Sequence, residues 1–345
     1  MSTLSAWFGP LYDAIFCPSL PFTLRWRLLG LQPIVFLTNT IQYLSTLFYQ
    51  GHRTAISIPL KRAPGHSLRA IVYHPGKPSP TRLRPLHLNI HGGGFLGGLP
   101  EGQTSFCQRV ADDTGAVVVS TSYRYAPRYT FPTAHEDVQD VAEWLVENAE
   151  RLWNANPRTL SVSGFSAGGN LALGVAQWLA QTEFCVKASV TFYAPVDLRL
   201  PPWEKPKPAG IPEKDPLAWL LPLMDAYAGP ERLENMGNPL LNPILADIES
   251  LPRHMMFVVP KVDILLQEQS VFIERLKEEA AAVNRGMSEQ NSKMQSRVYR
   301  IESRFDEGQI HGWLEIPSIF IDAKLRDAIF DSAVQFLENA YASHE

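Results

Sequence analysis

The sequence is poor in cysteine and has no run of basic charge. Its 345 residues include three cysteines, Cys17, Cys107 and Cys185, which lie far apart. An odd number of widely spaced cysteines argues against a disulfide framework and a CxxC-type metal site, so we expect a reducing, intracellular location in the cytoplasm. The formal net charge is −4, and the missing Lys/Arg run excludes the basic surface of a nucleic-acid-binding protein. The expected partner is therefore a small molecule that is neutral or weakly charged.

The sequence also lacks signals of secretion. No charged segment precedes an apolar run at the N-terminus, and no Asn-x-Ser/Thr acceptor occurs, so secretion is not predicted. Residues 28–50 carry no charge and are long enough to cross a bilayer, but polar residues such as Gln32 and Asn39 interrupt them. Apolar residues, Leu37 and Ile41 among them, recur at helical spacing. We interpret this segment as a helix that packs on the rest of the chain or lines a pocket, with membrane-surface contact as the less favoured alternative.

The composition predicts one domain with an appended cap. Hydrophobic residues make up 45% of the chain, enough to bury one large core. Residues 1–50 are rich in aromatics and contain four prolines, a pattern typical of short helices joined by tight bends. Residues 198–243 contain ten prolines among aromatic residues, which favours an ordered insertion covering a pocket. We therefore predict a cap segment at 1–50 and a main domain at 51–345 that carries this insertion.

Strands and helices alternate through the main domain. Strands are expected at 55–60, 68–74, 86–90, 116–123, 159–163, 188–193, 255–259 and 297–301. Helices are expected at 105–114, 133–153, 170–180, 266–283 and 319–341. This alternation predicts parallel strand pairing, with functional loops at the carboxyl ends of the strands.

Residues 164–168 read Gly-Phe-Ser-Ala-Gly between an expected strand and an expected helix. In that context G-x-S-x-G is a nucleophile elbow, a sharp turn that holds its serine in strained geometry above the sheet. The glycines allow a close approach of the chain that a Cβ would prevent. The following helix also directs its free N–H groups at negative charge that forms there. We therefore predict Ser166 to be a nucleophile for acyl transfer.

A nucleophilic serine needs a base, and the base needs an acid group to orient it. After an elbow of this kind, the acid and then the histidine follow the serine along the chain. His254 opens a strand and His344 lies in the terminal tail, whereas His311 stands between the last strand and the last helix. We predict His311 as the base. For the acid we choose Asp263, at a strand end, over Asp306, in the loop that carries the histidine.

Residues 91–95 read His-Gly-Gly-Gly-Phe at the end of another expected strand. Preorganised N–H donors stabilise the oxyanion formed by attack on an ester by on the order of 3 to 4 kcal/mol. Successive glycines let the backbone turn its amides inward, so the predicted donors are Gly93 and Gly94 with Ala167. A phosphate-binding loop is disfavoured, since no Lys-Ser/Thr follows. We expect no metal and no cofactor, and we expect substrate contacts from Phe95, Phe165, Leu37, Ile41 and Trp313.

HGGGF at 91–95 together with GFSAGGNLA at 164–172 resembles the hormone-sensitive-lipase-like, carboxylesterase branch of the α/β-hydrolases. Stretches at 122–127, 242–245 and 311–313 are similar to the same family, so the resemblance covers about residues 65–340. It implies an α/β-hydrolase fold with a mostly parallel eight-stranded sheet flanked by helices, and the triad and oxyanion hole named above. The chain departs from the family pattern D-P-L-x-D-E around the acid, where it reads Asp-Ile-Leu-Leu-Gln-Glu from 263 to 268.

The sequence therefore predicts a serine hydrolase that cleaves small to medium apolar carboxylic esters through an acyl-enzyme. The main alternative passes the same acyl group to another acceptor, as an acyltransferase or a lactone-forming or lactone-opening enzyme would. A non-catalytic small-molecule receptor is less favoured, because a complete nucleophile, base and acid set has no structural purpose. Oligomeric state and the physiological substrate are left open by the sequence.

Overall fold

The computed structural model describes residues 3–17, 20–45, 51–76, 83–211, 218–290, 298–316 and 320–342. Several predictions fall partly outside these ranges: residues 46–50 of the cap, residues 212–217 of the insertion, and positions 297, 319 and 344.

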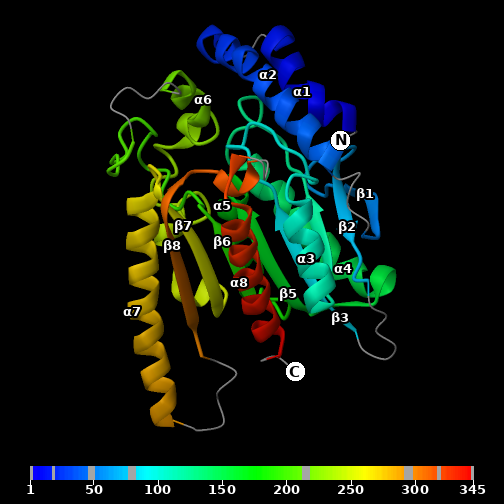
Figure 1. Cartoon of the computed structure of the whole chain (residues 1–345), viewed down its shortest axis with the longest axis vertical. Helices are drawn as coiled ribbons and strands as arrows, with labels where there is room; N and C mark the ends of the chain where they lie inside the picture. Colours follow the sequence, from blue (N-terminus) through cyan, green and yellow to red (C-terminus); the bar gives the residue numbers. More distant parts are fainter. Residues whose placement is uncertain are drawn as a thin grey trace.

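One eight-stranded sheet forms the centre of the fold (Figure 1). Its strands are β1 (Arg53–Pro59), β2 (Ser67–Tyr73), β3 (Arg84–Ile90), β4 (Val117–Thr121), β5 (Ala155–Phe165), β6 (Ala188–Phe192), β7 (His254–Val262) and β8 (Arg300–Ile310). They lie in the order β1-β2-β4-β3-β5-β6-β7-β8. The β1–β2 and β2–β4 pairs are antiparallel, and the five pairs from β4 to β8 are parallel. The predicted mostly parallel α/β-hydrolase sheet is confirmed.

Helices cover both faces of this sheet. They are α1 (Thr3–Phe16), α2 (Phe22–Ser45), α3 (Thr104–Thr114), α4 (Thr133–Trp153), α5 (Ala167–Leu179), α6 (Leu221–Met224), α7 (Leu266–Gln290) and α8 (Ala323–Ala342). Short 3-10 helices are η2 (Ala218–Leu220), η3 (Gly229–Glu231), η4 (Pro243–Leu245), η5 (Ile248–Ser250) and η7 (Trp313–Glu315). In Figure 1, α3 and α8 lie in front of the sheet and α4 and α5 behind it, while α7 runs beside β7 and β8.

The sequence patterns explain these layers. Strand β4 is rich in valine and all five of its residues are buried, as expected for a parallel strand covered on both faces. Helix α4 buries Val138, Val141, Leu145 and Ala149 completely. These residues recur every three or four positions, so one stripe of the helix faces the core.

The prediction that prolines break residues 1–50 into short helices is wrong at two positions. Pro10 lies inside α1, and Pro33 lies inside the 24-residue helix α2. A proline within a helix removes one backbone donor and crowds the preceding turn. Tertiary packing offsets that cost here, since Trp7 of α1 packs edge-on against Phe36 of α2 with 5.4 Å between ring centroids, and Leu28 is 1% exposed.

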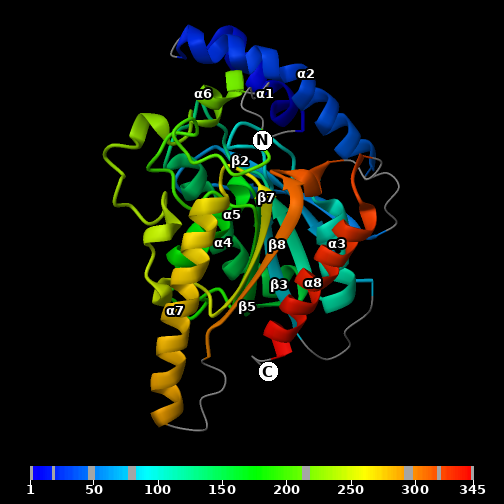
Figure 2. The ribbon, with the colours of Figure 1, turned by 60° about the vertical axis from the view of Figure 1, so that its left-hand side comes forward.

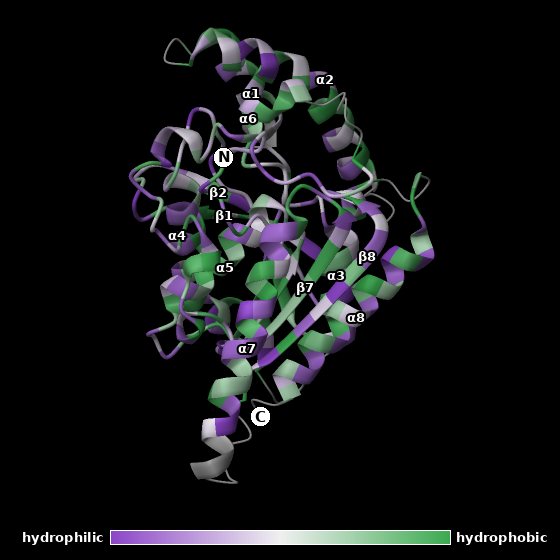
Figure 3. Cartoon of the chain, turned by 90° about the vertical axis from the view of Figure 1, so that its left-hand side faces the viewer, coloured by the Kyte–Doolittle hydropathy of each residue, from purple (hydrophilic) through white to green (hydrophobic). Residues whose placement is uncertain are grey.

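The hairpin of α1 and α2 lies at the end of the sheet where β7 and β8 terminate (Figures 1 and 2). It is joined to the proline-rich segment, because Trp26 stacks on Trp219 at 6.0 Å and Arg27 Nε donates to the Trp219 carbonyl at 2.8 Å. Many large hydrophobic side chains are exposed on it, and in Figure 3 green hydrophobic positions alternate with hydrophilic ones along α2. The large exposed hydrophobic residues of the hairpin are Phe8, Tyr12, Ile15, Phe16, Phe22, Trp26, Leu29, Ile34, Phe36, Leu37, Ile41, Tyr43 and Leu44. Within the described ranges, no helix combines the length and hydropathy needed to cross a bilayer.

Candidate active site

Five neighbouring parallel strands deliver side chains or loops to one edge of the sheet. The glycine loop starts directly after β3, and Ser166 directly after β5. Tyr193 follows β6, Asp263 follows β7 and His311 follows β8. Because the carboxyl ends of parallel strands meet at one edge, residues far apart in the sequence converge there.

The elbow has the strained geometry predicted for it. Ser166 has φ 48° and ψ −121°, backbone angles that a residue other than glycine adopts only when its surroundings hold it there. Its N–H donates to the Phe192 carbonyl at 2.8 Å. A Cβ on Gly164 would lie 2.1 Å from the Gly168 carbonyl oxygen, and one on Gly168 would lie 2.1 Å from the Ile90 carbonyl oxygen. Both glycines are therefore needed for the close passage of the chain.

The structure brings the three predicted triad residues together. Ser166 Oγ lies 2.8 Å from His311 Nε2, and His311 Nδ1 donates to Asp263 Oδ2 at 2.8 Å. The Asp263 side chain is completely buried, whereas 38% of the His311 side chain is exposed. The second Asp263 oxygen accepts from the Leu265 N–H at 3.0 Å. These contacts fix the carboxylate and, through it, the orientation of the imidazole.

The rejected candidates lie elsewhere. Asp306, within β8, accepts from Arg304 Nε at 2.8 Å instead of from the histidine. His254 begins β7, at the opposite end of the strand that leads to Asp263. The nine residues of β7 place His254 about 30 Å from Asp263. The geometry thus favours Asp263 and His311 over these alternatives.

Charge around His311 favours its protonated form. Burial lowers the pKa of His311, but the charge of Asp263 and its hydrogen bond raise it, with smaller contributions from the charges of Glu315 and Glu268. The balance places the pKa of His311 above its usual value. The imidazole is therefore suited to accept a proton and hold it as an imidazolium.

The glycine loop has the backbone shape expected of an oxyanion site. Gly93, Gly94 and Phe95 have φ of 120°, 61° and 61°, a conformation that favours glycine. Gly93 is exposed and Gly94 half-buried. His91 anchors the start of the loop, since its Nδ1 donates to the Gly92 carbonyl at 2.6 Å. The predicted donors Gly93 and Gly94 thus lie on an open turn beside the elbow, where Ala167 begins α5.

The predicted substrate-contacting side chains fall into two groups. Phe95 and Phe165 are 4% and 0% exposed, and each stacks on another buried ring with 4.1 Å between centroids. Trp313 is 1% exposed within the core under α8. These three rings pack in the core, so a substrate contact by them gains no support from the structure. Leu37 and Ile41 are exposed on α2 and remain available to a ligand.

Two carboxylates beside the site were not predicted. Glu268 accepts from the backbone N–H groups of Val196 and Asp197 and pairs with Lys205, so it ties α7 to the chain after β6. Glu315 lies in η7, close to His311. No local sequence signal pointed to Glu315, because its hydrogen-bond partners Gln103 and Tyr193 lie far from it in the chain.

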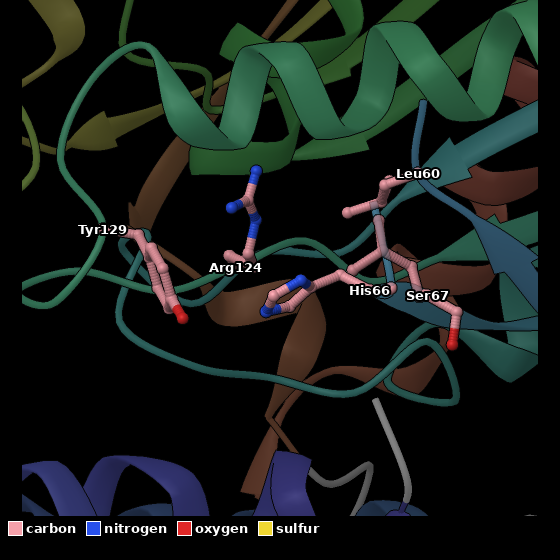
Figure 4. Close-up of a pocket in the computed structure, with 7 residues that line it drawn as sticks. Leu60, His66, Ser67, Arg124 and Tyr129 are labelled. Atoms are coloured by element: carbon pink, nitrogen blue, oxygen red, sulfur yellow. The ribbon is translucent and has the colours of Figure 1, made fainter. Parts of the chain in front are cut away.

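A hollow of about 190 Å³ away from these residues is drawn in Figure 4. It is lined by Leu60, Gly65, His66, Ser67, Leu68, Arg124 and Tyr129. The Arg124 guanidinium is already paired with Asp137, at 2.6 and 2.9 Å. Because none of the triad residues lines it, this hollow is not the catalytic site.

Comparisons with known proteins identify the family of the chain. The family Abhydrolase_3, described as an alpha/beta hydrolase fold, matches residues 87–295. The chain belongs to this family. An ethyl acetate hydrolase from Pseudomonas putida is 30% identical over 223 residues, which is 64% of this chain and 68% of that protein. Arylacetamide deacetylase from Oryctolagus cuniculus is 36% identical over 144 residues, 41% of this chain but only 36% of the relative.

Among solved structures, the carboxylesterase EstE1 from a metagenomic library is similar over most of its length. It is 27% identical with a TM-score of 0.69, covering 90% of this chain and 97% of EstE1. Together these findings confirm the resemblance and the class of this Abhydrolase_3 chain, which is an esterase-like or lipase-like hydrolase.

Proposed function

We propose that this chain hydrolyses small to medium apolar carboxylic esters through an acyl-enzyme on Ser166. The observation that supports the proposal most is the hydrogen-bonded series from Ser166 Oγ through His311 to Asp263, with 2.8 Å at each link. A nucleophile, a base and an orienting acid in this order are the parts that acyl transfer requires.

In the proposed mechanism, Ser166 Oγ attacks the ester carbonyl carbon while His311 Nε2 takes its proton. Asp263 holds the imidazole by Nδ1 and stabilises the imidazolium. The carbonyl oxygen becomes an anion that accepts from the amides of Gly93, Gly94 and Ala167. The imidazolium then protonates the leaving alkoxide, and an acyl-enzyme remains. Water, deprotonated by the same imidazole, attacks the acyl carbon and releases the acid and the serine.

The surface over the site and the names of the relatives support the proposed substrate class. The hairpin of α1 and α2 exposes aromatic and aliphatic side chains and has few charges, which suits an apolar ester group. Relatives include an ethyl acetate hydrolase and an arylacetamide deacetylase, names that both denote small acyl groups. We propose that residues 1–50 and the 198–243 insertion together form the cap, with Leu37 and Ile41 on its ligand-binding side. No cofactor takes part in this mechanism, and a cytoplasmic location stays a prediction.

The test combines turnover with labelling. Purified protein is assayed on p-nitrophenyl esters from acetate to decanoate, and it is treated with an organophosphonate before peptide mass spectrometry. We expect hydrolysis and a phosphonate adduct on Ser166, both absent in Ser166→Ala. Folded protein without turnover or adduct would contradict the proposal. Formation of a new ester when an alcohol acceptor is added, in place of free acid, would instead favour acyl transfer.

A further inference from the structure

Glu315 is a carboxylate that the proposed mechanism does not use. It is half-buried at the end of η7. Its Oε1 accepts from Gln103 Nε2 at 2.8 Å, and its Oε2 accepts from the Tyr193 hydroxyl at 3.2 Å. Within the described part of the chain, no lysine or arginine forms an ion pair with it. Two neutral donors are modest compensation for withdrawing a carboxylate from water, so its position needs another explanation.

The partners of Glu315 come from both halves of the catalytic apparatus. Tyr193 is completely buried and has a backbone φ of 44°, outside the range that residues other than glycine normally adopt. Its ring meets the imidazole of His311 edge-on, with 5.1 Å between centroids. The Glu315 carboxylate therefore supports, through Tyr193, one side of the base.

The second set of contacts concerns the glycine loop. A Cβ built on Gly92 would lie 2.8 and 2.9 Å from the two Glu315 oxygens, so the carboxylate lies directly against the backbone of Gly92. Gln103, which it also holds, precedes α3 and is 5% exposed. One side chain thus contacts the loop expected to hold the oxyanion and the tyrosine that supports the base.

We propose that ionised Glu315 is a positioning residue that fixes the base and the oxyanion loop relative to each other and helps to stabilise the His311 imidazolium. The inference rests on the proposed function. The positioning effect and the electrostatic effect can be tested separately, because one substitution can remove the negative charge of Glu315 and keep its hydrogen bonds, and another can remove both.

The charges facing this cluster give the pH dependence a definite sign. Those near His311 are Asp263 from the β7 end, Glu268 from α7 and Glu315 itself. Glu315 faces His311 and the hydroxyls of Tyr193 and Tyr123. Burial raises the pKa values of these two tyrosines well above their usual value. Burial raises the pKa of Glu315 to about 7, although the charge of His311 and the two hydrogen bonds lower it.

Only neutral imidazole takes the serine proton, so activity rises as pH rises through the pKa of His311. The Glu315 anion raises that pKa. Removing the anion should therefore lower the pKa of His311 and move the acidic limb of kcat/KM to lower pH. In the wild-type protein this limb reports on the coupled pair and not on either group alone.

Two substitutions separate charge from shape. Glu315→Gln keeps the side-chain volume, and Gln103 Oε1, which is buried without a partner, can turn to accept from the new amide. Glu315→Leu removes both the charge and the acceptors. Glu307→Gln is the matched control, since Glu307 lies in β8 with its side chain 80% exposed. Each variant is assayed from pH 5 to 9 on p-nitrophenyl acetate, and its rate of labelling by an organophosphonate is measured over the same range.

For Glu315→Gln we expect the acidic limb at lower pH in both assays, with plateau kcat within about threefold of wild type, because the hydrogen bonds that position the base remain. For Glu315→Leu we expect plateau kcat to fall roughly 10- to 100-fold with little change in KM, as for a misplaced catalytic group. Glu307→Gln should match wild type.

An unchanged acidic limb in Glu315→Gln would overturn the inference, and so would wild-type plateau kcat in Glu315→Leu. If Glu315→Leu fails to fold, the position of the acidic limb in the pH profile of Glu315→Gln decides whether the inference holds. Absence of turnover and labelling in the wild-type protein would instead contradict the proposed function itself.

Discussion

A serine hydroxyl does not ionise at neutral pH, so the reactivity proposed for Ser166 depends on the imidazole nitrogen 2.8 Å away. Ser166→Ala should reduce the rate of ester hydrolysis by roughly four to six orders of magnitude. His311→Ala should cause a loss of similar size, because the two groups act as one unit. Steady-state kinetics on a short-chain ester measures both losses. Retention of more than about a tenth of wild-type kcat in His311→Ala would assign the base elsewhere.

The acid can be tested at the same scale with two buried carboxylates, Asp263 and Asp306. Asp263→Asn should lower kcat by roughly 10⁴-fold, because the asparagine side chain cannot hold the imidazole in the tautomer that accepts the serine proton. Asp306→Asn is the matched control, since Asp306 is also buried but pairs with Arg304, and it should have little effect on kcat. The reverse order would make Asp306 the acid.

At the scale of elements, the elbow depends on contacts between backbones. A Cβ on Gly168 would lie 2.1 Å from the Ile90 carbonyl oxygen, and no side-chain rotation can relieve a clash with backbone. We expect Gly168→Ala to lower the free energy of unfolding by about 1 to 3 kcal/mol, as overpacking does, and to reduce kcat by displacing Ser166. Urea denaturation and ester kinetics measure the two effects.

Gly286→Ala provides the control for that substitution. Gly286 lies in α7, where an added Cβ would meet nothing within 4 Å. This substitution should leave kcat unchanged and stabilise the protein by up to about 1 kcal/mol. If Gly168→Ala behaves in the same way, the close passage of the elbow has no energetic importance.

Local patterns predicted the order of the strands along the chain. They also selected Ser166, Asp263 and His311 as the candidate triad, whose role in catalysis stays a proposal. Ser166 and Asp263 follow strands whose apolar residues mark them, whereas His311 follows β8, which contains five charged residues and was predicted only as far as residue 301. His311 was selected by its order in the chain after the elbow and not by the pattern of its strand. The prolines of α1 and α2 misled the prediction, because packing between the two helices outweighs the local preference of Pro10 and Pro33.

Glu315 shows a second reason why a sequence pattern was insufficient. Its partners Gln103 and Tyr193 are 212 and 122 residues away in the sequence. No periodicity or short motif encodes contacts of that range. The burial of the Phe165 and Trp313 rings was also not predicted, because a residue one or two positions from a candidate catalytic residue can point into the core.

At the scale of the whole molecule, the position of the α1–α2 hairpin is the feature that sequence patterns predict least well. Its place depends on contacts such as that between Arg27 and Trp219, 192 residues apart. Through them the hairpin lies at the end of the sheet that carries the triad (Figures 1 and 2). A cover of apolar residues there would bind the apolar part of an ester and keep water from it.

Deleting residues 1–50 should therefore raise KM for long-chain or bulky esters much more than for acetate esters, because the lost surface contacts only the longer groups. Leu37→Asp and Ile41→Asp should cause a milder form of the same bias. Leu152→Asp is the matched control, since Leu152 is 41% exposed near the end of α4, away from the hairpin. KM measured across acyl chain lengths, with circular dichroism to establish folding, gives the comparison.

A different outcome would assign the hairpin another role. Aromatic and aliphatic residues exposed on a helix with few charges can also lie in the interface of a lipid bilayer. If the truncated protein hydrolysed long and short esters in the wild-type ratio but lost affinity for phosphatidylcholine vesicles, the hairpin would be a membrane contact and not a substrate cover. A chain-length bias that appears in solution without vesicles supports the cap, because a surface that serves only to bind lipid has no effect on KM for dissolved esters.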